Sequence, residues 1–127
     1  PAIIIGLFAS VFCYIAVAVI KPKLGYDDSL DAFGVHGISG ILGIIATGLF
    51  ASKAINPLGS DGLFFGNPHQ LFVQTLAVVV TVVYSAVVTF IIYKVVDKTI
   101  GMRVSEKEEA VGLDLSQHRE GAYTMVE

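Results

Sequence analysis

Residues 31–40, with the sequence DAFGVHGISG, open the second of three long apolar runs in this chain. Within them, His36 lies among glycine and aliphatic residues, a few positions inside a stretch long enough to cross a bilayer. Ionisable side chains in such stretches are costly in lipid and tend to mark functional sites. We therefore treat His36 as the leading candidate functional residue.

The composition of the chain is that of a membrane protein. Hydrophobic residues make up 54% of its 127 residues, and the mean hydropathy is +0.75. Long runs with few charges are typical of transmembrane helices. The net charge of −3 comes mainly from the C-terminal tail, which argues against a nucleic-acid-binding surface. The single cysteine, Cys13, has no Cys or His cluster near it, so we expect neither an intrachain disulfide nor a metal site.

The apolar runs predict an all-α fold, a polytopic bundle of membrane helices. The expected transmembrane helices cover about residues 1–20, 31–52 and 70–96. Twenty helical residues rise about 30 Å, which matches the hydrocarbon core of a bilayer. The first helix is expected to end at Lys21-Pro22-Lys23, because proline cannot continue the helical hydrogen bonding.

The polar segments predict how the helices begin and how they face the membrane. Asp27, Asp28 and Ser29 precede the second helix and suit its N-terminus, with capping and a direct role in transport as the alternatives. Residues 97–127 are rich in charge and are expected to form a soluble tail after the membrane region 1–96. Of the eight Lys and Arg residues, all but Lys53 lie on the side of the tail. That side is therefore predicted to be cytoplasmic.

Three interpretations of His36 follow from the residues alone. It could be a pore or relay group, because an imidazole gains and loses a proton near neutral pH. It could be a neutral residue that bridges two helices, or a ligand of a metal or haem. The lack of a second histidine or carboxylate three or four positions later weighs against the ligand.

Two separated motifs resemble the ammonium transporter (Amt) family, in its bacterial form. Residues 28–40, in the pattern DxxDxFGVHGxxG, are similar to the tenth span of that family. Residues 112–123, GLDLSQHREGAY, are similar to its cytoplasmic signature, and residues 101–104, GMRV, to the approach to it. The resemblance covers essentially the whole chain, as spans nine to eleven and the C-terminal region. We therefore expect the chain to be the C-terminal part of a longer protein.

The resemblance implies eleven helices in two inverted halves, a homotrimer, and one hydrophobic pore per subunit, in the cell (inner) membrane. Inverted repeats around a midplane site are a common plan of transporters. His36 would be the second of two pore histidines, with the first upstream of this chain. The residues that would support the pore or line its cytoplasmic vestibule are Asp28, Asp31, Ala32 and Phe33. The implied activity is the recruitment and conduction of ammonium or ammonia, without catalysis or a cofactor.

In the tail, the resemblance implies an element that couples subunits and responds to PII-type nitrogen-regulatory proteins. Its candidate residues are Gly112, Asp114, His118 and Tyr123, with a tail that packs on its own subunit as the alternative. Arg119 stands where many relatives carry glycine, so a different local turn is expected there. Two other functions stay open: a small helical membrane subunit, with a structural His36 bridge and a partner-recruiting tail, and a family member that acts as a sensor.

Overall fold

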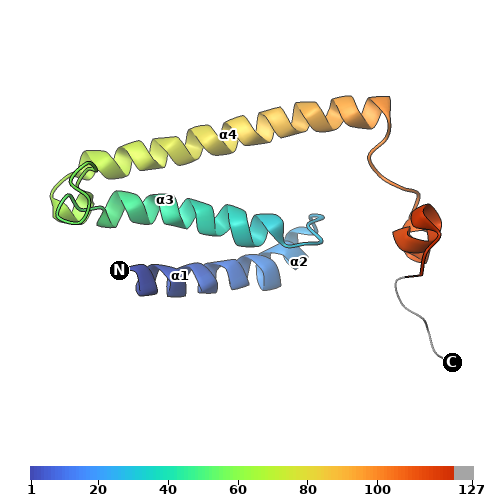
Figure 1. Ribbon diagram of the computed structural model, residues 1–127, viewed down its shortest axis with the longest axis horizontal. Helices are drawn as coiled ribbons and strands as arrows, with labels where there is room; N and C mark the ends of the chain where they lie inside the picture. The colour runs from blue at the N-terminus through green and yellow to red at the C-terminus, as the bar shows by residue number, and fades with distance from the viewer. Residues whose placement is uncertain (122–127) are drawn as a thin grey trace. The chain divides into compact units, whose positions relative to one another are not determined.

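The computed structural model describes residues 1–121, and these are helical with no strand among them (Figure 1). Three helices are long and apolar enough to cross a membrane: Ala2–Leu24, Phe33–Phe50 and Pro68–Thr99. The expected fold class, an all-α bundle with three membrane helices, is confirmed. The chain divides within the third of these helices into two compact units, residues 1–83 and 84–127, which are described separately below.

The first membrane helix continues through Pro22, so the expected end at Lys21 is wrong. It consists of three segments: α1 (Ala2–Ile15), the π-helical turn η1 (Ala16–Ile20) and α2 (Lys21–Leu24). The wider π turn interrupts the α-helical register just before the proline. Pro22 therefore lies in the first turn of a new α-helical segment, where a missing N–H is tolerated. The helix ends instead at Gly25, which has the left-handed φ of 65°.

The second membrane helix also contains a π turn, in this case at its start. It comprises η2 (Phe33–Gly37) and α3 (Ile38–Phe50), and α3 lies beside α1 (Figure 1). Gly34 is buried where the two membrane helices pack together. A Cβ at this position would approach a side-chain methyl of Val17 to only 2.7 Å. A glycine at such a position lets two helix backbones come close together.

The segment after α3 folds back on the end of that helix. The 3₁₀ turn η3 (Leu63–Phe65) lies within it, and the rings of Phe50 and Phe64 are 5.1 Å apart. The N–H of Gly62 donates to the carbonyl of Ala51 at 2.7 Å. This packing sets the point at which the chain enters the third membrane helix.

The third membrane helix, α4 (Pro68–Thr99), is a regular α-helix of 32 residues without a buried side chain. Its first turns lie against α3, where a Cβ on Gly48 would approach Leu71 to 3.0 Å. Beyond it, the second unit contains α5 (Glu106–Val111) and the π turn η4 (Asp114–His118).

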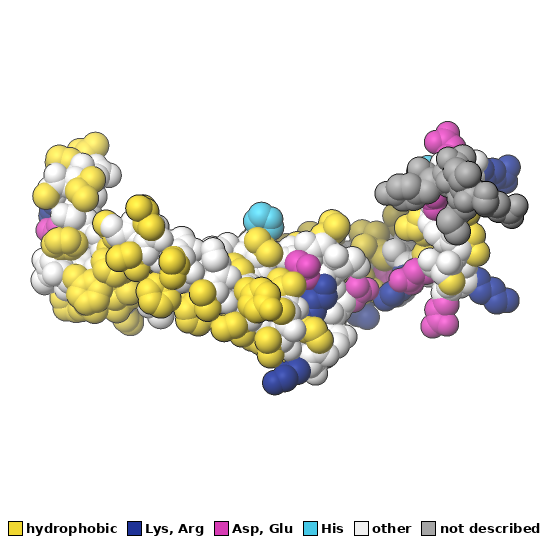
Figure 2. Space-filling view, turned by 90° about the horizontal axis from the view of Figure 1, so that it is seen from below, with side chains coloured by type: hydrophobic (Ala, Val, Ile, Leu, Met, Phe, Trp, Pro, Cys, Tyr) yellow, Lys and Arg dark blue, Asp and Glu magenta, His cyan; other side chains and the backbone are white. Residues whose placement is uncertain are grey.

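Large hydrophobic side chains are exposed along all three membrane helices, and they cover much of the face seen in Figure 2. Among the described residues, Ala16 is the one hydrophobic side chain in a buried core, at 4% exposure. Apolar surface of this extent is unfavourable in water. It suits contact with lipid tails or with other membrane helices.

Candidate functional site

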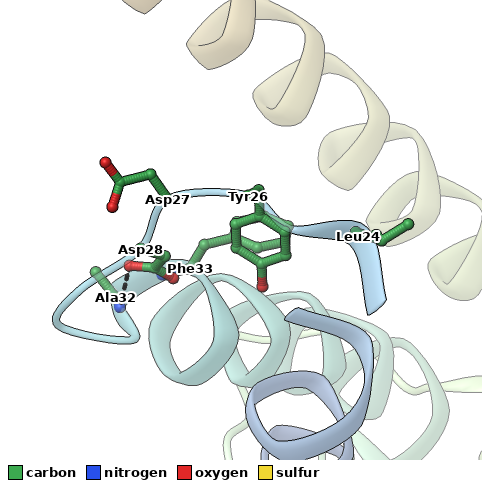
Figure 3. Close-up of a pocket in the computed structure, with 6 residues that line it drawn as sticks. All are labelled: Leu24, Tyr26, Asp27, Asp28, Ala32 and Phe33. Atoms are coloured by element: carbon green, nitrogen blue, oxygen red, sulfur yellow. Dashed lines mark hydrogen bonds between the residues drawn. The ribbon is translucent and has the colours of Figure 1, made fainter. Parts of the chain in front are cut away.

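The Asp28 carboxylate caps the helix that carries His36. One of its oxygens accepts the N–H of Ala32 at 2.8 Å (Figure 3). The other accepts those of Phe33 at 3.0 Å and Gly34 at 3.4 Å. The carboxylate reaches over the helix start from five residues before Phe33, the first residue of η2. It satisfies backbone donors that have no partner inside the helix, and its charge suits the positive end of the helix dipole.

Lys21 ties the same connector to the first membrane helix. Its Nζ donates to the Asp31 carboxylate at 2.5 Å and to the backbone carbonyl of Asp28 at 2.6 Å. The two charged side chains are only 25% and 34% exposed. The backbone of Asp31 has a left-handed φ of 55°, which is uncommon for a residue other than glycine but tolerated by aspartate. The lysine thus holds an unusual turn directly before the capped helix.

This role of Lys21 was not predicted from the sequence, in which Lys21 marked the expected end of the first helix and counted among the cations on the side of the tail. One signal was available. Lys21 and Asp31 flank a short connector between two antiparallel helices, so opposite charges at its two ends can meet.

The predicted vestibule residues Ala32 and Phe33 line an open pocket of about 430 Å³. Its other lining residues are Leu24, Tyr26, Asp27 and Asp28. The rings of Tyr26 and Phe33 meet edge to face, with centroids 6.3 Å apart, and Asp27 points outward in Figure 3. Aromatic rings beside carboxylates are a suitable environment for a small cation.

His36 lies inside the π turn η2, and its side chain is exposed. No neighbouring helix among the described residues covers it. A bridge to another helix is likewise not formed within this part of the chain. π turns within α-helices are frequent at functional sites because they change the direction in which a side chain projects. The connector and the π turn bring Asp28, Asp31, Ala32 and Phe33 to the start of the helix that presents His36.

In the tail, the start of α5 is a local capping box. Ser105 accepts the N–H of Glu108 at 3.3 Å, and the Glu108 carboxylate accepts the N–H of Ser105 at 3.0 Å and its hydroxyl at 2.7 Å. These hydrogen bonds from Ser105, the hydroxyl first, lower the pKa of Glu108 below its ordinary value. Arg103 adds an exposed ion pair with Glu109 at 3.2 Å.

The predicted regulatory residues follow this helix. Gly112 ends α5 with φ 99°, and Asp114 and His118 lie at the two ends of the turn η4. Arg119 takes the left-handed conformation, with φ 58°, that glycine adopts most readily. Tyr123 lies outside the described residues.

Comparisons with known proteins agree over almost the full chain. A model of the Ammonium Transporter Family matches residues 1–123. An ammonium transporter of Bacillus subtilis is 48% identical over 122 residues, which are 96% of this chain and 30% of that protein. Ammonium transporter Amt1 of Archaeoglobus fulgidus is 51% identical over 124 residues, 97% of this chain and 31% of that protein. The chain thus spans about three-tenths of the length of these relatives.

Proposed function

The chain belongs to the ammonium transporter family, and on this premise we propose that it forms part of a pore for ammonium or ammonia. The observation that carries the proposal is His36, an exposed imidazole in a π turn near the start of a membrane helix. The family match places this span among proteins that are named ammonium transporters.

His36 would act as one of two histidines that relay a proton. Ammonium must lose its water to enter an apolar channel, and a bare cation there is strongly disfavoured. A neutral imidazole can accept a proton from the ion and pass it on, so that ammonia crosses between aliphatic walls. The second imidazole would come from a part of the transporter outside this chain.

The acid-rich connector would form the cytoplasmic vestibule of the pore. Asp28 would keep the helix start in place, while Asp31, Ala32 and Phe33 would line or support the exit. The charge of Asp27 and the rings around the pocket would favour a cation there. This arrangement assigns the vestibule a supporting role and leaves proton transfer to His36.

The remaining proposals concern topology and regulation. We place residues 1–96 in the cell (inner) membrane and residues 97–127 in the cytoplasm, from the excess of Lys and Arg on the side of the tail. The transporter would be a homotrimer with one pore per subunit. Its tail would bind a PII-type regulatory protein, through residues that include Gly112, Asp114, His118 and Tyr123.

The test is the ammonium-evoked current of the full-length protein in liposomes. We expect His36→Ala to abolish the current or to remove its net charge transfer. The matched control is His69→Ala, because His69 is also an exposed histidine of this chain but lies at the start of α4. That control should keep the current. An unchanged current in His36→Ala would overturn the proposed relay.

A further inference from the structure

The carbonyl oxygen of Val35 accepts hydrogen bonds from residues of two helices. The N–H of Ile38 and the hydroxyl of Ser39, at 2.5 Å, donate to it from its own helix. The thiol of Cys13, on α1, donates to it from the neighbouring helix at 3.4 Å. Among the described residues, the bond from Cys13 is the only side-chain hydrogen bond between α1 and the helix of His36.

The contact lies where two π turns meet. η1 interrupts the first membrane helix and η2 begins the second, and the two turns pack against each other beside Gly34 and Val17. A π turn displaces its carbonyl groups from the regular i→i−4 pattern of an α-helix. Carbonyls displaced in this way are open to side-chain donors, as the Val35 carbonyl is to Ser39 and Cys13.

The Val35 carbonyl has a direct geometric link to His36. It belongs to the peptide unit that also contains the N–H of His36, and a peptide unit is planar. Anything that fixes this carbonyl therefore also fixes the His36 N–H and Cα, the atom from which the side chain projects. The close approach at Gly34 keeps the Cys13 thiol within reach of the carbonyl.

We propose that Cys13 and Gly34 are positioning residues that hold the π turn at Val35 and thereby set the direction of the His36 imidazole. Cys13 acts through the Val35 carbonyl, and Gly34 acts by admitting Val17 of the first membrane helix. The consequence for transport rests on the proposed function, whereas the contact itself does not.

The contact is tested by the infrared S–H stretching band of Cys13 in the full-length protein. The band is isolated as the difference between the unmodified protein and Cys13→Ala. In the unmodified protein, we expect this band at a lower wavenumber than that of a thiol without an acceptor. In Gly34→Ala, we expect it at a higher wavenumber than in the unmodified protein. In Gly43→Ala it should stay, because a Cβ at that position meets nothing within 4 Å among the described residues. A band at the position of a free thiol in the unmodified protein would overturn the proposal.

The consequence is tested by the pH profile of the ammonium current. Cys13→Ala removes the donor with a small change in volume, and we expect a current lower by about tenfold and a displaced pH midpoint. Cys13→Ser keeps a donor and should restore both. A normal profile in Cys13→Ala would overturn the positioning role, and this variant stays informative if Gly34→Ala fails to fold.

The two proposals fail in different ways. A current that survives His36→Ala, together with a low S–H band, would overturn the relay and leave the contact in place. A free-thiol band, together with a current lost in His36→Ala, would overturn the contact and leave the relay in place.

Discussion

The helix of His36 and the tail helix α5 both have a carboxylate that accepts backbone N–H groups at the N-terminus, but the two caps differ in where the carboxylate comes from. The capping box of α5 is complete within the four residues from Ser105 to Glu108. The helix of His36 is capped by Asp28 from the connector, and Lys21 of the preceding helix holds that connector. A local cap fixes a helix only to itself. The tethered cap fixes the helix of His36 to its neighbour.

Among the changes that test this difference between the two caps, Asp28→Ala is expected to have the largest effect on local stability. The change leaves the N–H groups of Ala32, Phe33 and Gly34 without their acceptor, at a cost of about 2 kcal/mol in local stability. Hydrogen exchange at these three amides in the full-length protein should accelerate by more than tenfold. Asp28→Asn keeps one acceptor oxygen and should give an intermediate rate. Equal rates in the unmodified protein and Asp28→Ala would show that the cap is unimportant.

A smaller effect is expected from Lys21→Met, which removes the tether and keeps the cap. The loss of a half-buried ion pair and of a hydrogen bond to a carbonyl should be measurable as faster hydrogen exchange in the connector. The matched change in the tail is Arg103→Met. Its ion pair has side chains that are 66% and 52% exposed, so the cost should be below about 0.5 kcal/mol. Similar costs for the two variants would contradict the distinction between a tethered and a local start.

Ser105→Ala should cost about 1 kcal/mol and act on α5 alone. We expect the exchange of the Glu108 amide to rise about fivefold, since 1.4 kcal/mol corresponds to a factor of ten. The amides from Ala32 to Gly34 serve as the internal control and should exchange at their usual rates. A change there would mean that the tail cap is coupled to the membrane helices.

The smallest effect is the pH dependence of α5. Because the pKa of Glu108 in the folded tail lies below its ordinary value of 4.5, its ionised form stabilises the cap at pH values above that. This contribution is lost as the pH falls through the lowered pKa. An NMR titration of the Glu108 carboxyl should report the lowered pKa, and Ser105→Ala should return it towards 4.5. A midpoint that Ser105→Ala does not move would exclude the serine as the cause.

The sequence was sufficient to predict those features that depend on short stretches of chain. Three apolar runs were enough to predict three membrane helices, because length and hydropathy are local properties. The capping role considered for the acids of the connector is likewise seen at Asp28. Such features need no knowledge of what packs nearby.

The features that escaped prediction depend on contacts between helices. The first helix passes through Pro22 directly after the π turn η1. The two π turns of the membrane helices, η1 and η2, have no composition that distinguishes them from ordinary helix. The left-handed backbone conformation of Asp31 is explained by its ion pair with Lys21, a residue of the preceding helix. The surroundings of His36 could not be predicted either, since no neighbouring helix among the described residues covers its side chain.

The buried positions of the described chain are one alanine and three glycines: Ala16, Gly34, Gly48 and Gly62. Apolar surface gains little when it moves from lipid to a neighbouring helix, so contacts through such small residues depend on close fit. Each membrane helix must therefore be stable once inserted, before it meets its neighbours. Biogenesis would then occur in two stages, insertion followed by lateral assembly. A bulky residue at Gly34 would leave insertion intact and arrest the second stage, with the protein in the membrane but unassembled.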